Sequence, residues 1–132
     1  MGFVWATSEA LPFKDRSLDG VSCVFSIHHM DKEKLDEVMG ELKRVLKDDG
    51  NIFIAEDLVE TPEQRHVTEK IDRKLNFESA DAQHNYKSDQ EWAEYFDSQG
   101  LEIVERKFFE SESKDGTVTH GFYVLKFSEL KK

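Results

Sequence analysis

The sequence is short of cysteine, of basic residues and of long apolar runs, and each shortage excludes a class of protein. Its one cysteine excludes an internal disulfide. Lys and Arg number 18 against 28 Asp and Glu, and the net charge of −10 disfavours binding to nucleic-acid phosphate or anionic membranes. No apolar run approaches the roughly 20 residues that span a bilayer, and no signal-peptide pattern is present. We therefore expect a cytoplasmic protein with no nucleic-acid or membrane partner.

Short motifs that bind cofactors, phosphates or metals are missing as well. No G-x-G-x-x-G, P-loop or serine nucleophile elbow occurs in the sequence. Neither C-x-x-C nor H-x-x-x-H is present, and His66 and His120 lack ligand-like spacing, so we expect no metal site. Cys23 lies in an apolar run and is expected to be a buried small hydrophobe. Any activity must therefore come from residues that the fold brings together.

What the sequence does contain is a strand–helix–strand pattern over residues 11–57. Residues 21–27 hardly alternate between apolar and polar, which is typical of a strand covered on both faces in a parallel sheet. Asp31 is the expected N-cap of the helix, and Gly50 is expected to end it with a positive φ. The helix has one apolar stripe, which consists of Leu35, Val38, Met39, Leu42, Val45 and Leu46. The pattern predicts a βαβ unit with a right-handed crossover.

Two further helices are predicted by capping boxes at residues 61–64 and 88–91. The first helix, over residues 62–77, has a thin apolar stripe and is expected to be peripheral. The second has three aromatic side chains on one face and Gly100 beyond its end. The stripes consist of Val67, Ile71 and Leu75 in the first helix and of Trp92, Tyr95 and Phe96 in the second.

Two strand-like runs close the sequence, at residues 101–110 and 117–127, with a strong turn signal at Asp115-Gly116 between them. The chain of 132 residues is long enough for one domain with a real core. The predicted fold is α/β: parallel strands followed by an antiparallel C-terminal hairpin, with helices packed on the faces of the sheet.

Residues 11–31, LPFKDRSLDGVSCVFSIHHMD, and residues 42–57, LKRVLKDDGNIFIAED, resemble a known family. They are similar to the central segment of class I S-adenosylmethionine-dependent methyltransferases, the seven-stranded Rossmann-like kind that acts on small molecules. Leu18 replaces the usual Phe, and Asp48-Asp49 replaces the usual Pro-Gly. The similarity continues loosely to the C-terminus. It implies that residues 1–132 are a single domain resembling the C-terminal part of such an enzyme, a truncated Rossmann-like fold.

The resemblance implies S-adenosylmethionine as the cofactor and a small molecule as the methyl acceptor. It places Ser26 and Ile27 near the methionine part of the cofactor. Thr7 and Ser8 stand in the adenine-binding segment, with Thr7 where an Asp usually accepts the adenine amino group. The family's glycine-rich turn and its ribose-binding acidic residue are absent. We therefore expect this chain alone to bind S-adenosylmethionine weakly or not at all.

His28 and His29 are the predicted catalytic residues, because they follow the first strand at its carboxyl end, where α/β sheets bind ligands. One of them would act as a general base or orient an acceptor hydroxyl. The alternative is a pair of loop histidines, one packed and one facing solvent.

Substrate-binding residues are predicted in two places. Glu56 and Asp57 end the second strand on the same side, either to bind a cationic acceptor or simply to terminate the strand. His84 and Tyr86 belong either to a substrate lid or to an ordinary loop.

The strand at residues 21–27 lacks the outer neighbour that the family's sheet provides, and it has no Lys or Pro to protect an edge. Residues 2–6 folding back, a homodimer, or a partner chain would complete the sheet. Three functions are consistent with this: a methyltransferase whose cofactor half is supplied elsewhere, a non-catalytic binding domain derived from the fold, and a standalone enzyme with a reduced cofactor site.

Overall fold

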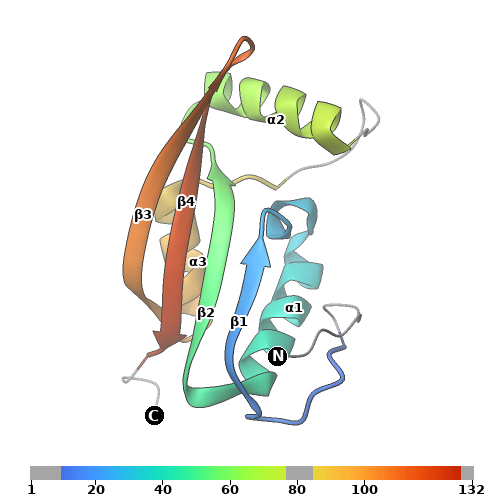
Figure 1. Cartoon of the computed structure of the whole chain (residues 1–132), viewed down its shortest axis with the longest axis vertical. Coiled ribbons are helices and arrows are strands. Elements are labelled where there is room, and N and C mark those ends of the chain that lie inside the picture. The colour runs from blue at the N-terminus through green and yellow to red at the C-terminus, as the bar shows by residue number, and fades with distance from the viewer. Residues whose placement is uncertain (1–9, 77–84, 129–132) are drawn as a thin grey trace.

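The computed structural model describes residues 10–76 and 85–128, which form one mixed four-stranded sheet with three α-helices (Figure 1). The elements in chain order are β1 (Leu18–Val24), a 3₁₀ turn (Ile27–His29), α1 (Lys32–Val45), β2 (Leu46–Leu58), α2 (Pro62–Asn76), α3 (Asp89–Ser98), β3 (Leu101–Ser113) and β4 (Gly116–Phe127). The predicted α/β class is confirmed. No helix in the described part of the chain has the length and apolar composition to cross a membrane.

The βαβ unit forms as predicted. β1 and β2 pair in parallel, with Val21 opposite Ile52, and α1 joins them. Asp31 caps α1 by accepting a hydrogen bond from the Lys34 backbone N–H at 2.8 Å. The apolar stripe of α1 is buried against the sheet. The strand order is β1-β2-β4-β3, with β4 antiparallel to both neighbours, so the predicted C-terminal hairpin is confirmed.

β1 is shorter and more exposed than its apolar sequence predicts. The strand ends at Val24, and Phe25 leaves the sheet with a φ of 50°, in the left-handed region. The side chain of Val24 is 60% exposed, so the strand is not buried on both faces. The apolar residues do lie on both faces, but α1 packs on one of them and no described helix covers the other.

The prediction for Gly50 was wrong. Helix α1 ends at Val45 and β2 begins at once with Leu46, so no left-handed residue is needed between them. Gly50 lies within β2, where a Cβ atom would come 2.5 Å from Leu46 Cδ1 and 2.9 Å from the Asp19 carbonyl oxygen. Glycine is required there by close packing rather than by a turn.

In the C-terminal half, the helix cap and the glycine turns form where the sequence predicted them. Ser88 and Glu91 form the predicted capping box of α3, and Gly100 beyond its end has a φ of 77°. Gly116 has a φ of 134° at the hairpin turn, where only glycine fits easily. Trp92 and Phe96 of α3 are fully buried and stack at 5.6 Å.

The predicted stripe of α2 was wrong in part. Leu75 is 74% exposed, whereas the buried positions of the helix are Thr68 and Asp72, one turn apart. Figure 1 shows α2 across the end of the sheet, away from α1 and α3. The helix therefore covers polar groups at the strand ends instead of the apolar core.

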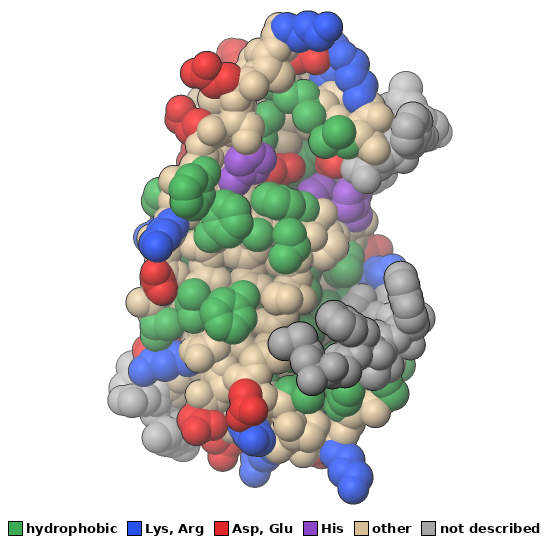
Figure 2. Space-filling view, viewed as in Figure 1, with side chains coloured by type: hydrophobic (Ala, Val, Ile, Leu, Met, Phe, Trp, Pro, Cys, Tyr) green, Lys and Arg blue, Asp and Glu red, His purple; other side chains and the backbone are tan. Residues whose placement is uncertain are grey.

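The two faces of the sheet differ. The core lies between one face and helices α1 and α3, which Figure 1 shows behind the strands. On the other face Phe53 and Phe122 are 46% and 38% exposed. Figure 2, in the same view, shows this apolar patch as a run of green side chains. β1 and β3 are the two edge strands among the described residues, and the proposed cover of β1 by residues 2–6 falls outside them.

Phe96→Ala and Phe53→Ala test the difference between the covered and the open face of the sheet with the same change of side chain. Phe96 is fully buried, so its truncation should lower the free energy of unfolding by about 3–5 kcal/mol. Phe53→Ala should cost less than half as much, because that ring is already 46% exposed. Urea unfolding of both variants measures the two costs. Equal losses would mean that the face carrying Phe53 is covered in solution.

Candidate functional site

A pocket of about 360 Å³ lies where the carboxyl end of β1 meets α2 and the hairpin. We call it the strand-end pocket. It is lined by Phe25, His28, Asp57, Thr68, Ile71, Asp72, Leu75, Ser111, Ser113, Val118 and His120. Figure 2 shows histidine side chains between the apolar patch and the end of the molecule that α2 occupies. The pocket is at the end of the sheet where α/β folds bind ligands.

One wall of the pocket belongs to a buried cluster of His28, Glu56, Asp72 and Tyr86, the His28 cluster. The 3₁₀ turn after β1 directs His28 inward, where the residue is only 1% exposed. Its Nδ1 is hydrogen-bonded to Glu56 Oε1, and its Nε2 lies 2.8 Å from Asp72 Oδ2. One imidazole thus joins the end of β2 to helix α2.

Backbone groups hold the cluster in place. The His28 N–H donates to Glu56 Oε2 at 3.1 Å, and the Asp57 N–H donates to Glu56 Oε1 at 3.0 Å. The Tyr86 hydroxyl donates to Asp72 Oδ2 at 2.6 Å, and its ring stacks on His28 at 4.9 Å. Asn85 donates its N–H to the His28 carbonyl oxygen at 2.6 Å, which ties residues 85–86 to the turn. Every member therefore has at least two contacts within the cluster or with the neighbouring backbone.

The electrostatics of the cluster follow from this geometry. Burial alone would lower the pKa of His28, but the hydrogen bond and charge of Glu56, together with Asp72, raise it to about 9. Burial opposes ionisation of Asp72, yet the Tyr86 hydroxyl and His28 hold its pKa below the usual value. Burial and the neighbouring Asp72 carboxylate raise the pKa of Tyr86. At neutral pH His28 is therefore a cation between two carboxylates, and it must lose a proton before it can act as a general base.

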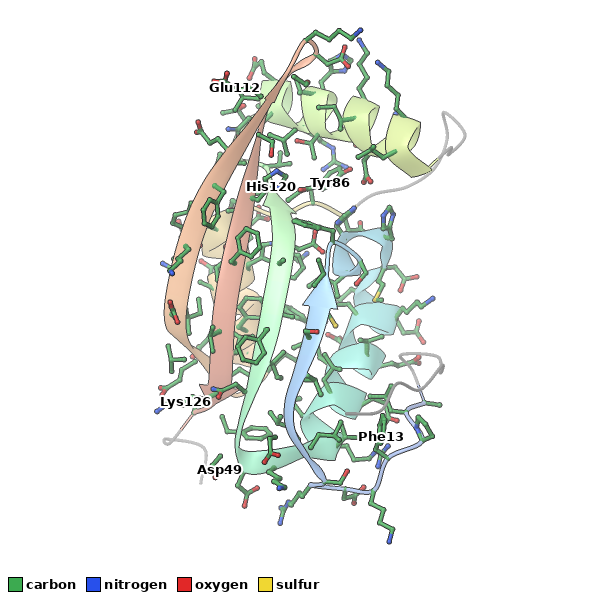
Figure 3. All side chains as sticks on the ribbon, in the orientation of Figure 1. Phe13, Asp49, Tyr86, Glu112, His120 and Lys126 are labelled. Atoms are coloured by element: carbon green, nitrogen blue, oxygen red, sulfur yellow. The ribbon has the colours of Figure 1, made fainter. Side chains whose placement is uncertain are left out.

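A second histidine lies on the opposite wall. The Nδ1 of His120 lies 2.8 Å from Asp57 Oδ1, and its Nε2 lies 2.7 Å from Ser111 Oγ. Asp57 and His120 face each other across β2 and β4, and Ser111 comes from β3. Phe25 packs edge-on against the His120 ring, with centroids 5.4 Å apart. Figure 3 shows His120 and Tyr86 at the same end of β2. A histidine oriented by a carboxylate in this way is suited to proton transfer.

The structure brings most of the predicted site residues together. His28, Glu56 and Tyr86 are in the His28 cluster, and Asp57 is hydrogen-bonded to His120. The turn itself contributes the two predicted cofactor residues in this region: Ile27 is buried in the core, and Ser26 precedes it with a half-buried side chain. Thr7, Ser8 and His84 lie outside the described residues.

His29 follows His28 but faces outward. Its side chain is 34% exposed, and its Nε2 lies 3.9 Å from Asp72 Oδ1. One histidine of the pair is therefore packed and the other partly open to solvent. The catalytic roles of the two remain predictions.

Sequence reasoning missed Asp72 and His120. The spacing of Thr68 and Asp72 by one helical turn marks a shared face of α2, but only the structure shows that this face is the buried one. His120 is identified only once the register of β4 against β2 is known, since that register places it opposite Asp57.

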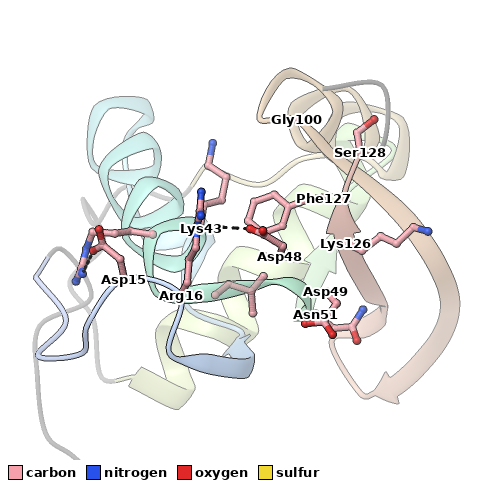
Figure 4. Close-up of a pocket in the computed structure, with 12 residues that line it drawn as sticks. Asp15, Arg16, Lys43, Asp48, Asp49, Asn51, Gly100, Lys126, Phe127 and Ser128 are labelled. Atoms are coloured by element: carbon pink, nitrogen blue, oxygen red, sulfur yellow. Dashed lines mark hydrogen bonds and ion pairs between the residues drawn. The ribbon is translucent and has the colours of Figure 1, made fainter. Parts of the chain in front are cut away.

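A larger hollow of about 1040 Å³ lies at the other end of the sheet (Figure 4). Charged groups of both signs surround it, and they are largely exposed: Arg16 and Asp48 pair at 3.5 Å with side chains 73% and 82% accessible. Lys43 donates from Nζ to the Gln99 carbonyl oxygen at 3.0 Å. Solvated ion pairs of this kind contribute little binding energy, so we place the candidate site at the strand-end pocket.

The fold is a Rossmann-like α/β fold, and its candidate site is a pocket at the carboxyl ends of the parallel strands. Comparison with known proteins agrees: residues 1–54 match the family model of the methyltransferase domain. A ubiquinone/menaquinone biosynthesis C-methyltransferase of Hahella chejuensis is 39% identical over 54 residues, which are 41% of this chain and 21% of that protein. The matched part thus spans about a fifth of the curated relative's length.

Solved structures show the same fold over nearly all of the chain. A putative methyltransferase from Bacillus halodurans has a TM-score of 0.62 at 15% identity, covering 93% of this chain and 74% of that one. The 1,6-didemethyltoxoflavin-N1-methyltransferase of Burkholderia thailandensis was solved with S-adenosylhomocysteine bound. It has a TM-score of 0.71 at 13% identity, and the match covers 96% of this chain and 51% of that one. The chain resembles class I S-adenosylmethionine-dependent methyltransferases, as the sequence predicted.

Glu56→Gln tests the charge balance of the His28 cluster. The substitution leaves the His28 cation paired with Asp72, but it replaces one of the two acceptor oxygens at position 56 with an amide NH₂ and so leaves a buried donor without its acceptor. We therefore expect a loss of about 1–3 kcal/mol in the free energy of unfolding at pH 7. Glu102→Gln is the matched control, because Glu102 pairs with Lys126 at 3.1 Å on the surface and should cost under about 1 kcal/mol. Chemical denaturation of both variants gives the comparison. A loss at Glu56 no larger than that of the control would contradict an ionised cluster.

Cys23 is half-buried in β1 and packs against the core, so the prediction of a buried residue is only partly right. It should still react slowly with alkylating reagents. Burial, with a further contribution from the charge of Glu56, raises its pKa from 9.0 to about 11. The thiolate is the reactive form, so at pH 8 the folded chain should be alkylated about 100-fold more slowly than the unfolded chain. Because the folded pKa is the higher one, the thiol's contribution to stability is lost as the pH rises from about 9 to about 11. Iodoacetamide labelling with and without urea measures the ratio, and equal rates would contradict the burial.

Proposed function

We propose that this chain is an S-adenosylmethionine-dependent methyltransferase-like protein that takes a small-molecule acceptor in the strand-end pocket. The observation that carries the proposal is the position of this pocket at the carboxyl ends of β1 and β2, in a fold shared with methyltransferases. Its volume of about 360 Å³ suits a small molecule. Its walls combine apolar surface from Phe25, Ile71 and Val118 with polar groups.

One polar atom of the pocket supports a bound ligand in particular. Thr68 Oγ1 is buried and has no hydrogen-bond partner among the described residues. A buried hydroxyl without a partner costs about 1–3 kcal/mol, and a polar atom of a ligand would satisfy it. Thr68 and His120 both line the pocket, so a ligand there lies within the same small volume as the paired imidazole.

Methyl transfer depends mainly on proximity and alignment of the donor methyl with the acceptor. In this proposal the His28 cluster keeps the strand ends rigid and forms the pocket wall. The Asp57–His120 pair is the group able to accept a proton from the acceptor, because Asp57 fixes the imidazole through Nδ1, while Nε2 contacts the Ser111 hydroxyl instead of a second carboxylate. Glu56 is committed to His28, which argues against its predicted role in binding a cationic acceptor.

The residues present do not fit the whole cofactor. No glycine-rich turn exists in the sequence, and the ribose-binding acidic residue is missing. Of the two predicted cofactor residues that the structure describes, Ser26 and Ile27, only Ser26 has a polar side chain. We propose that the remaining contacts come from a partner chain carrying the glycine-rich half of the fold. It would pair with the open edge of β1 and extend over the adjoining face of the sheet, where Val24, Phe53 and Phe122 line an apolar groove of about 270 Å³. The predicted cytoplasmic location stays a prediction.

Titration with S-adenosylhomocysteine, followed by NMR of the backbone amides, tests both parts. At millimolar ligand we expect shift changes centred on residues 26–30 and 56–58, with no saturation in the low micromolar range. Saturation at low micromolar ligand would show that the chain needs no second half. Changes centred instead on residues 48–51, in the hollow at the opposite end, would show that the strand-end pocket is not the site.

A further inference from the structure

Three side chains with metal-binding atoms converge beside the strand-end pocket. The ligand atoms of His28, His29 and Asp72 all lie within 4.8 Å of one another. His28 Nε2 is 2.8 Å from Asp72 Oδ2, and His29 Nε2 is 3.9 Å from Asp72 Oδ1. Ligands around a tetrahedral zinc ion are roughly 3.3 Å apart, given zinc–ligand bonds of about 2.0–2.2 Å. The two separations involve different oxygens of the Asp72 carboxylate, Oδ2 toward His28 and Oδ1 toward His29. With one atom from each residue, all three lie within 4.8 Å, so side-chain rotations would bring them onto one ion.

The surroundings of His28 are those of a metal-ligating imidazole. Histidines that bind metals through one nitrogen almost always donate the other N–H to a carboxylate or a carbonyl group, which fixes the ring. Here Nδ1 is bonded to Glu56, and Glu56 is itself held by the backbone N–H groups of His28 and Asp57. The Tyr86 hydroxyl likewise orients Asp72 through Oδ2. The supporting shell therefore directs His28 Nε2 and the Asp72 carboxylate toward the same point.

Charge also favours a cation at this point. Glu56 is fully buried and Asp72 is 7% exposed, so two carboxylates lie in the interior beside one imidazole. Uncompensated buried charge is costly. A single proton on His28 neutralises one of the two carboxylates, whereas a divalent ion neutralises both. Nitrogen and carboxylate ligands together suit zinc and its first-row neighbours rather than calcium or magnesium.

The geometry also leaves access and an open coordination position. His29 is 34% exposed at its side chain, so an ion can reach the site past this residue. Three protein ligands are the number found in zinc sites that keep a position for water or substrate. His28 and Asp72 both line the strand-end pocket, so that position would face the pocket.

We propose that His28, His29 and Asp72 form a binding site for one divalent transition-metal ion of the zinc type, with an oxygen ligand from the pocket completing its coordination. This site adjoins the pocket proposed for the methyl acceptor, but zinc binding there does not require methyl transfer. It also replaces the expectation, drawn from spacing alone, that the chain has no metal site. Spacing could not indicate it, because Asp72 comes from a helix far from the histidine pair in the sequence.

Calorimetric titration of the chelator-treated full chain with ZnCl₂ tests the proposal. We expect one zinc per chain with micromolar or tighter affinity. His29→Ala should weaken binding at least tenfold without loss of folding, because this ligand is partly exposed. His66→Ala is the matched control: His66 is an exposed histidine on α2, outside the three-ligand set, and its removal should leave the affinity unchanged. Thermal unfolding confirms that each variant is folded.

Cobalt provides a second readout that adventitious surface binding would not give. Co²⁺ bound by His28, His29 and Asp72 should show the intense visible absorption of a four- or five-coordinate ion, and Asp72→Asn should abolish it. The proposal is overturned by an absence of zinc binding, by equal zinc affinity in His29→Ala and the parent chain, or by the weak spectrum of six-coordinate cobalt.

Discussion

The imidazole of His28 lies between carboxylates from two different elements, and the architecture around the strand ends depends on this interaction. Glu56 belongs to β2 and Asp72 to α2, so the pair of bonds fixes a peripheral helix onto the end of the sheet. The other contacts of α2 are weaker: its buried face is polar, Leu75 is exposed, and the ion pairs of Lys70 and Lys74 with Asp115 at the hairpin turn are partly solvated. The strand-end pocket exists because α2 is held there.

The same interaction explains why two histidines of the pocket differ in character. His28 is buried with a carboxylate at each ring nitrogen, which stabilises its charged form. His120 has one carboxylate and one hydroxyl, at 2.8 and 2.7 Å. Identical side chains a short distance apart are therefore suited to different tasks, the first to holding structure or a cation and the second to exchanging a proton. The sequence predicted a catalytic role for His28 and none for His120, and the role of His28 stays a prediction.

Local signals predicted much of the fold. The capping residues Asp31 and Ser88, the stripe of α1 and the turn at Gly116 each depend on a few neighbouring residues, and each is confirmed. Residues 21–27 were misread because an apolar run shows that both faces could be buried, not that both are covered. The site was only half predictable. Glu56 and Tyr86 could be predicted because they lie at a strand end and in a loop near it. Asp72 and His120 reach the pocket through the packing of α2 and the register of β4 against β2. Neither of these is encoded by the neighbouring residues in the sequence.

The open apolar face has a consequence for how the chain behaves in concentrated solution. Exposed Phe and Val side chains attract other copies at short range, while a net charge of −10 repels them at long range. The balance between these forces is set by the solvent, since salt screens the repulsion and acid near the isoelectric point of about 4.9 removes it. Colloidal stability of this fold is thus electrostatic in origin: the acidic surface keeps apart molecules whose sheets would otherwise adhere.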